Sequence, residues 1–226
     1  LYENEIENCL LNIKQKKISG ANVTVPFKKK VIPYLDLLSL EAEKTQSVNT
    51  IVLNENNLVG YNTDIVGFEL AIKKLNFNLE GKEIFILGAG GVVPSIIFAL
   101  QKMKVLTIKI TNRTKEKAEN LKTQFGNLEI VSWGQIPDFD VVINATSLGL
   151  KKEDINLNFS KAGENKLFYD VIYNPSETNF LNEAKKLNNQ CENGKLMFIY
   201  QASAAFELWH GIKPPVNNDT IEFLNL

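Results

Sequence analysis

A cluster of glycines directly after an apolar strand constrains this chain more than any other feature. Residues 83–87 form a nearly continuous apolar run, which is typical of a strand covered on both faces of a sheet. Gly88, Gly90 and Gly91 follow at once, and a helical run of apolar residues begins after them. Such a unit brings backbone N–H groups close to a phosphate at a helix N-terminus. Because Val93 stands where the full G-x-G-x-x-G pattern has its last glycine, a tight turn without a ligand is the alternative.

Strands and helices alternate from this unit onward, over residues 80–193. The alternation favours a parallel, doubly wound sheet. The further strands that we expect are 106–111, 128–131, 141–143 and 167–172, and the further helices are 114–124 and 178–187.

The first 75 residues have a different pattern. A strand at 20–26, ended by Pro26, and a hairpin of 48–53 with 58–61 are expected there. Apolar residues at three- and four-residue spacing predict helices at 4–17, 27–38 and 65–75, and a longer one at 196–209 near the chain end.

Side-chain positions follow from these elements. Either Thr63 or Asp64 could cap the helix that begins at 65. In the last long helix we expect Phe198, Phe206, Leu208 and Trp209 to pack between helices. The fold class predicted is α/β with two lobes: a doubly wound parallel sheet and a smaller α/β unit.

Composition excludes several classes of function. The net charge is -1, from 25 basic and 26 acidic residues, so the chain has no overall positive field that would attract nucleic acid or an anionic membrane. No uncharged apolar run reaches ~18 residues, so no transmembrane helix is expected. His210 is the only histidine, which rules out multi-histidine metal sites, and we expect no metal. Cys9 and Cys191 are expected as free thiols in a reducing, cytoplasmic setting, with one disulfide as the alternative.

Arg113 is the only arginine in the chain, and it follows the second expected strand of the parallel sheet. A site for NAD usually has a carboxylate at that place to bind the ribose 2′-hydroxyl. A guanidinium there can instead bind a 2′-phosphate and stack on adenine. The residue therefore favours NADP, with a solvated surface arginine as the alternative.

Four polar residues of the first lobe come from neighbouring strand ends and loops: Thr24, Lys28, Asn49 and Asp64. If they converge on one cleft, the lysine could donate a proton to a ketone and the aspartate could orient it. The simpler alternatives are a solvated helix face for the lysine and a helix cap for the aspartate.

An ordered series of motifs along nearly the whole chain resembles the shikimate dehydrogenase family. The matching segments are GANVTVPFK at 20–28, VNT at 48–50, GYNTD at 60–64, GAGG at 88–91, NRT at 112–114, NATSLG at 144–149, DVIYNPSET at 170–178, NG at 193–194 and YQASAAFELW at 200–209.

The resemblance implies NADPH-dependent, reversible reduction of 3-dehydroshikimate to shikimate, in the pathway to chorismate and aromatic amino acids. It implies that Lys28 exchanges a proton with the substrate oxygen and that Asp64 pairs with it. The substrate-binding residues implied are Thr24, Lys28, Asn49, Asp64, Tyr173 and Gln201.

The resemblance also implies a cofactor site for NADP. Its expected residues are Gly88, Ala89, Gly90, Gly91 and Val92 at the pyrophosphate, Asn112, Arg113, Thr114 and Lys117 at the 2′-phosphate and adenine, and Val171 and Gly194 near the nicotinamide.

The implied domains are a substrate-binding and catalytic lobe made of 1–64 and 195–226, and an NADP-binding Rossmann-like domain of 65–194. The implied partner is a small-molecule substrate, with the protein as a monomer or homodimer. A quinate/shikimate dehydrogenase of broader specificity is the nearest alternative. A cofactor-binding protein without turnover, as a degenerate paralogue or a fragment, is the alternative from another class.

The chain differs from the family pattern at three places, and each difference leads to an expectation. Leu1 falls at about the first helix of the family, so we expect the usual preceding strand and serine-containing carboxylate-binding motif to be absent, with reduced activity as the consequence. Ile65 replaces a usual glycine, which places the backbone beside Asp64 differently. The run Val92-Val93-Pro94-Ser95 replaces small residues and an arginine, which changes how the helix meets the cofactor.

Overall fold

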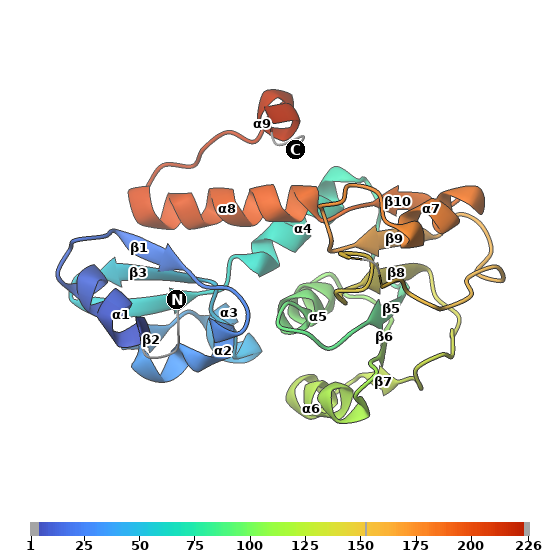
Figure 1. The fold of residues 1–226 in the computed structure, drawn as a ribbon, viewed down its shortest axis with the longest axis horizontal. Coiled ribbons are helices and arrows are strands. Elements are labelled where there is room, and N and C mark those ends of the chain that lie inside the picture. The colour runs from blue at the N-terminus through green and yellow to red at the C-terminus, as the bar shows by residue number, and fades with distance from the viewer. Residues whose placement is uncertain (1–4, 152, 224–226) are drawn as a thin grey trace.

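The computed structural model describes residues 5–151 and 153–223, whose strands form two separate sheets, one in each of two lobes (Figure 1). The predicted α/β class with a parallel sheet and a second lobe is confirmed. The helices α4 (Asp64–Lys74) and α8 (Lys195–His210) run between the lobes.

The first lobe has a mixed sheet in the strand order β1-β3-β4-β2. Its apolar core contains Ile13, Ile51 and Leu58, all almost fully buried. The elements of this lobe are α1 (Ile6–Lys14), β1 (Gly20–Asn22), α2 (Phe27–Lys30), a 3₁₀ turn (Ile32–Tyr34), β2 (Leu37–Leu38), α3 (Leu40–Thr45), β3 (Thr50–Asn54) and β4 (Asn57–Tyr61).

The hairpin of β3 and β4 is confirmed, with Thr50 opposite Tyr61 in the register. The strand expected at 20–26 is shorter than predicted. It ends at Asn22, because the chain turns back at the next residues, where the N–H of Phe27 donates to the carbonyl of Thr24 at 2.8 Å.

The single helix predicted over 27–38 is wrong. Pro33 has no N–H to donate to a preceding turn, so α2 is followed only by the short 3₁₀ turn. Asp36 then holds the chain beside β4 through two hydrogen bonds to Leu58. Its N–H donates to the Leu58 carbonyl at 3.0 Å, and its carboxylate accepts from the Leu58 N–H at 2.7 Å. Hydrogen bonding to β4 therefore overrides helical spacing in this segment.

The second lobe has a parallel sheet in the order β10-β9-β8-β5-β6-β7. Strand order reverses between β5 and β8, and ligands of doubly wound folds bind beyond the carboxyl ends at that point. The strands are β5 (Glu83–Leu87), β6 (Thr107–Thr111), β7 (Glu129–Ile130), β8 (Val141–Asn144), β9 (Leu167–Asp170) and β10 (Gln190–Glu192), and the helices α5 (Val93–Lys102), α6 (Lys115–Phe125) and α7 (Asn179–Lys186).

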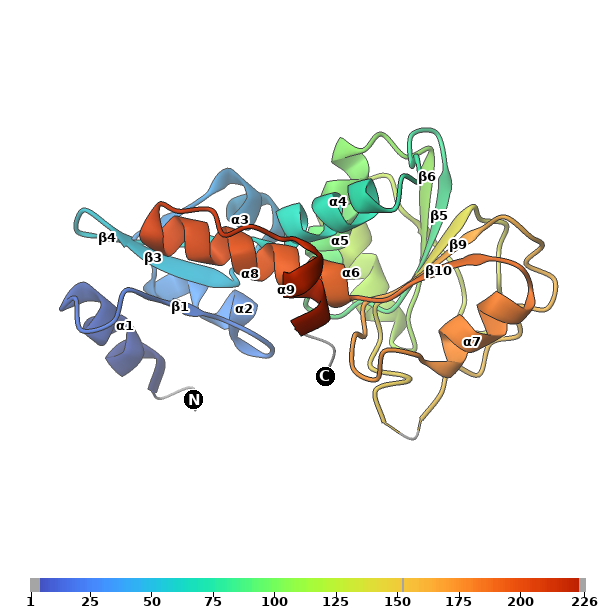
Figure 2. The same cartoon turned by 90° about the horizontal axis from the view of Figure 1, so that it is seen from above.

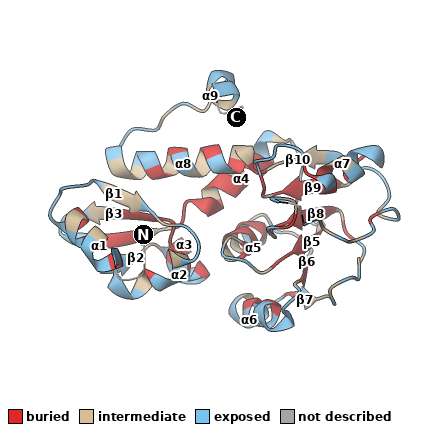
Figure 3. Cartoon of the chain, in the orientation of Figure 1, coloured by how far each residue is buried: buried red, intermediate tan, exposed pale blue. Residues whose placement is uncertain are grey.

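Both faces of this sheet are covered, as the apolar run of β5 requires (Figure 3). Ile84 and Ile86 point to the face covered by α4, α5 and α6, whereas Phe85 and Leu87 point to the α7 face. The sequence pattern does not predict β10, since Gln190–Glu192 is a short polar segment.

Helix α8 reaches from the parallel sheet to the first lobe (Figure 2). It packs closely on α4 because Gly67 lacks a side chain: a Cβ there would lie 2.7 Å from the carbonyl oxygen of Met197. At its other end, Trp209 Nε1 donates to the carbonyl of Ile51 at 3.0 Å. The last helix described is α9 (Asn218–Phe223), and no helix in the described part of the chain is long and apolar enough to cross a membrane.

Candidate functional site

The amino group of Lys28 and the carboxylate of Asp64 form an ion pair where the lobes meet. Their Nζ–Oδ2 distance is 2.5 Å, and the two side chains are only 14% and 9% exposed. Lys28 is in the first turn of α2, and Asp64 is the first residue of α4. The lysine is thus not a solvated helix residue.

Asn49 connects this ion pair to two further side chains. Its Nδ2 lies 3.0 Å from Oδ1 of Asp64, 2.9 Å from the hydroxyl of Thr63 and 3.3 Å from Oε1 of Gln201. Its Oδ1 accepts from the N–H of Thr63 at 2.8 Å. Because Asn49 is only 3% exposed, these bonds fix the amide in a single orientation.

The helix-cap interpretation of Thr63 and Asp64 is wrong. Thr63 stands at the N-cap position of α4, but its side chain makes no cap hydrogen bond. Its hydroxyl and the Asp64 carboxylate are bound instead by Asn49, which is 14 and 15 residues away in sequence. A residue distant in sequence therefore binds the side-chain oxygens that local spacing predicts as helix caps.

Tyr173 and Thr24 lie outside this hydrogen-bonded group. The ring of Tyr173 stacks on Phe198, with centroids 4.7 Å apart and planes at 21°. The expected burial of Phe198 and Phe206 between helices is wrong, since the two residues are 39% and 41% exposed, whereas Leu208 and Trp209 are half-buried. Thr24 is an exposed residue of the turn before α2.

The glycine turn after β5 is shaped by close backbone packing. Gly88 has φ of +107°, and a Cβ on it would lie 2.9 Å from the carbonyl oxygen of Ala145. Gly90 and Gly91 are exposed, and a Cβ on Gly91 would lie 3.2 Å from Val25 of the other lobe. The turn is therefore open to a ligand on one side and close to the Thr24–Pro26 segment on the other. Ala89 and Val92 complete it and are half-buried.

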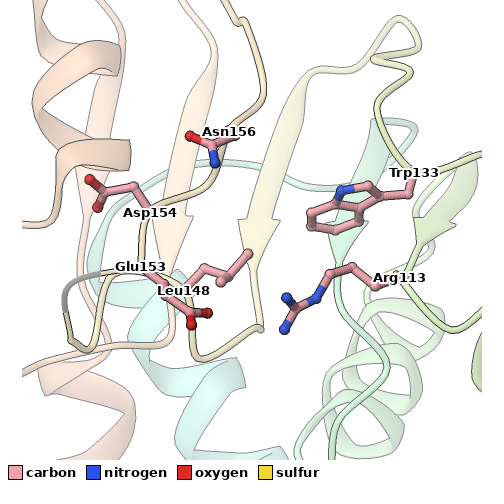
Figure 4. Close-up of a pocket in the computed structure, with 6 residues that line it drawn as sticks. All are labelled: Arg113, Trp133, Leu148, Glu153, Asp154 and Asn156. Carbon is pink, nitrogen blue, oxygen red and sulfur yellow. The ribbon is translucent and has the colours of Figure 1, made fainter.

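Arg113 lines a pocket of about 440 Å³ at the carboxyl end of the sheet (Figure 4). Trp133 lies on the same side, and Leu148 and Glu153 lie across from them. Asp154 and Asn156 also line this pocket. Asn112 donates to the carbonyl of Thr114 at 2.8 Å, which closes the turn that carries Arg113, and Lys117 is exposed one turn into α6.

Val171, directly after β9, and Gly194, directly before α8, are in close backbone contact. A Cβ on Gly194 would clash with the Val171 carbonyl, so only glycine fits there. The N–H of Gly194 donates to the carbonyl of Ile172 at 3.1 Å. The contact brings the start of α8 against the carboxyl end of β9.

Asp170 is a fully buried carboxylate at the end of β9. It accepts hydrogen bonds from Asn144 at 2.9 Å, from the hydroxyl of Thr178 at 2.6 Å and from the N–H of Ile172 at 3.0 Å. Burial raises the pKa of Asp170 to about 6, and the three hydrogen bonds oppose that rise. The carboxylate ties the loops after β8 and β9 together.

Sequence reasoning missed several residues that the structure places beside these groups. Asn62 lies within the GYNTD motif, and Ser95 within the departure after the glycine turn; they are hydrogen-bonded to each other at 2.9 Å. Trp133 follows the third strand of the parallel sheet at its carboxyl end, and that position is the signal that could have indicated a pocket residue. Among the described residues, no group of three or more His, Cys, Asp or Glu side chains could hold a metal ion.

Three family models match the chain. The shikimate dehydrogenase substrate binding domain matches residues 1–51, the shikimate/quinate 5-dehydrogenase model matches 69–179, and the shikimate 5′-dehydrogenase C-terminal domain matches 196–218.

Relatives of known name and structure agree with these matches. A shikimate dehydrogenase (NADP⁺) of Pelagibacter ubique is 54% identical, over 100% of this chain and 86% of its own length. A Listeria monocytogenes shikimate 5-dehydrogenase crystallised with shikimate and NAD superposes with a TM-score of 0.91 at 27% identity, over 100% of this chain and 84% of the other. A Thermus thermophilus shikimate 5-dehydrogenase, in complex with NADP(H) and shikimate, gives 0.85 at 30% identity, over 98% and 81%.

Proposed function

The chain belongs to the shikimate dehydrogenase family, and from that premise we propose that it catalyses the reversible, NADPH-dependent reduction of 3-dehydroshikimate to shikimate. It is an NADP-dependent oxidoreductase of the shikimate pathway, as its relatives are named. The observation that carries the proposal is the shielded ion pair of Lys28 and Asp64 at the junction of the lobes.

Lys28 is the proposed proton carrier. NADPH, when bound, supplies the hydride that converts the carbonyl carbon of the substrate to an alcohol carbon. The carbonyl oxygen must then gain a proton, and the Lys28 ammonium has three N–H donors of which Asp64 engages one. In the reverse direction the same amino group accepts the proton from the alcohol. Asp64 holds the amino group in place and offers its carboxylate to a substrate hydroxyl.

Substrate binding is assigned to side chains that face the same junction. Asn49 donates to Asp64, and the same amide donates to Gln201, so the amides of Asn49 and Gln201 can extend the polar surface of the ion pair to a polyhydroxylated ring. Thr24 and Tyr173 are proposed as outer contacts, because both are exposed on segments that flank the junction.

The residues at the cofactor site fit a dinucleotide that carries a 2′-phosphate. Because Gly90 and Gly91 have no side chains, a pyrophosphate can approach their backbone. The other residues of this turn are Gly88, Ala89 and Val92. Arg113 supplies a guanidinium in a pocket large enough for a purine ring, where Asn112, Thr114 and Lys117 are its neighbours. The contact of Val171 with Gly194 forms the proposed nicotinamide end.

We assign substrate binding and catalysis to residues 1–64 with 195–226, and NADP binding to 65–194. The division falls at the starts of α4 and α8, which join the lobes. The hydrogen bond from Trp209 to Ile51 supports the placement of α8 with the first lobe.

A dehydrogenase that also accepts quinate is the second candidate, because the model matched by 69–179 describes both activities. Quinate and shikimate differ in their ring substituents. Selectivity between them therefore depends on contacts around Asn49 and Gln201 rather than on the proton carrier.

The test is oxidation of shikimate and of quinate by the purified protein, each followed with NADP⁺ and with NAD⁺. We expect turnover of shikimate with NADP⁺ and weaker turnover in the other three combinations. Comparable kcat/KM for both substrates would support the broader enzyme. NADPH binding without turnover of either substrate would favour a non-catalytic cofactor-binding protein.

A further inference from the structure

Ser95 lies at the third position of α5, directly after the glycine turn, and is completely buried. Its hydroxyl does not cap its own helix: α5 has no side-chain cap at its start. A buried hydroxyl needs a partner, and the partner here belongs to the other lobe.

That partner is Asn62, two residues before Asp64 in the segment that leads into α4. Asn62 Nδ2 donates to Ser95 Oγ at 2.9 Å, and Ser95 Oγ also lies 3.2 Å from Asn62 Oδ1. Asn62 is only 6% exposed, and its Nδ2 also lies 3.0 Å from the hydroxyl of Thr45. The side-chain amide is therefore held from two elements at once.

The same amide reaches the candidate catalytic carboxylate. Asn62 Oδ1 accepts a hydrogen bond of 3.2 Å from the backbone N–H of Asp64. A continuous path of hydrogen bonds thus runs from the first turn of the helix behind the glycine turn to the backbone of Asp64.

We propose that Ser95 is a positioning residue, which fixes Asn62 and through it the backbone of Asp64 relative to the cofactor-binding helix. The inference rests on the proposed function, because it gives Asp64 and the glycine turn their roles. Hydride transfer requires the substrate and the cofactor to be held at a defined separation, and a buried link between the two lobes serves that requirement.

The chain offers a matched control for this link. Gln124 of α6 also bridges the lobes, since its Nε2 donates to the carbonyl of Lys44 at 3.0 Å. That bond is exposed and ends in α3, away from Asp64. Ser95→Ala removes both hydrogen bonds between Ser95 and Asn62, and Gln124→Ala removes the single bond to Lys44. Both variants thus remove contacts between the lobes, but only Ser95→Ala removes a partner of Asn62.

In Ser95→Ala, Asn62 keeps Thr45 and the Asp64 N–H, so the protein should still fold. We expect kcat/KM for shikimate to fall about tenfold, within the range typical of coupling between sites. We expect the Kd of NADPH, measured by its fluorescence, to change less than about twofold, because the backbone of the glycine turn is unaltered. Gln124→Ala should match the wild type in both measurements.

Hydrogen exchange supplies a readout that does not depend on turnover. The Asp64 amide is protected by Asn62, so peptides covering residues 60–66 should exchange faster in Ser95→Ala and at the wild-type rate in Gln124→Ala. Unchanged exchange and unchanged kcat/KM in Ser95→Ala would overturn the proposal. A loss of NADPH affinity as large as the fall in kcat/KM would also overturn it, because Ser95 would then support only the cofactor helix.

The wild type in the same assay separates the two hypotheses. If the wild type binds NADPH but does not oxidise shikimate, the proposed function fails, and the exchange rates alone decide the role of Ser95. If the wild type is active and Ser95→Ala equals it in every measurement, only the role of Ser95 fails.

Discussion

The side-chain amide of Asn49 donates to Oδ1 of Asp64 at 3.0 Å, while the Lys28 amino group engages Oδ2 of the same carboxylate. The two oxygens of Asp64 thus have separate partners, one from α2 and one from the segment before β3. A carboxylate held on both sides cannot rotate away, and it keeps the lysine at one place at the lobe junction. This arrangement underlies the predicted effect of changing Lys28.

Lys28→Ala should lower kcat by ~10²–10⁴, because it removes the proposed proton carrier from the carbonyl oxygen. Steady-state oxidation of shikimate with NADP⁺ measures the effect. The matched control is Lys29→Ala, since Lys29 is the next residue of the same helix and is exposed. A rise in KM at constant kcat would instead assign Lys28 to substrate binding.

Arg113→Ala should weaken binding of NADPH by at least about tenfold more than binding of NADH, because only NADPH carries the 2′-phosphate that a guanidinium can bind. Fluorescence titration with each cofactor gives the two Kd values. Lys115→Ala removes an exposed positive charge two residues away and should leave the NADPH-to-NADH ratio unchanged. Equal losses of both cofactors in Arg113→Ala would contradict the role.

Gly90→Ala should bind NADPH at least about tenfold more weakly while melting at the wild-type temperature. A Cβ at Gly90 would lie 3.7 Å from the Ala145 carbonyl oxygen, an ordinary contact, so the fold accepts it. The methyl group would then occupy space that a pyrophosphate needs. Gly88→Ala is the contrasting variant: its φ of +107° and a Cβ contact of 2.9 Å predict lost stability. Unchanged NADPH affinity in Gly90→Ala would place the pyrophosphate elsewhere.

The parallel sheet could be predicted from sequence because its signals are local. Residues 83–87 are apolar on both faces, and the glycines after them mark the turn into α5. The hairpin of β3 and β4 has the same property, with polar residues 54–57 between two β-prone runs. Each of these elements is specified by residues within a few positions of itself.

The remaining features depend on partners that are distant in sequence. Asp36 directs the chain beside β4 through Leu58, which no helical periodicity in 27–38 could show. Thr63 has the residue type of a cap, but Asn49 uses its hydroxyl. In the sequence Ser95 is only a departure from a family pattern, because its partner Asn62 is 33 residues away and is brought next to it by the fold.

Asp170 should make stability depend on pH between its ordinary pKa of 3.8 and its raised pKa of about 6. Across that window the folded protein keeps a proton that the unfolded chain has lost, so the free energy of unfolding falls as pH rises. The fall attributable to Asp170 is at most about 3 kcal/mol, and it is complete above the raised pKa. Asp170→Asn has no such group, so its urea-unfolding free energies should show a weaker dependence on pH over this window.

The comparison must isolate Asp170 from other titrating groups. Burial also raises the pKa of Glu192, which adds to the fall, whereas the Leu58 N–H lowers the pKa of Asp36, whose effect on stability lies mainly below pH 3.8. Both groups are present in the wild type and in Asp170→Asn, so the difference between the two pH curves reports Asp170 alone. Asp219→Asn, on α9, is the control for removing an exposed carboxylate. If Asp170→Asn kept the wild-type slope between pH 3.8 and about 6, the carboxylate would titrate at its ordinary pKa despite its burial.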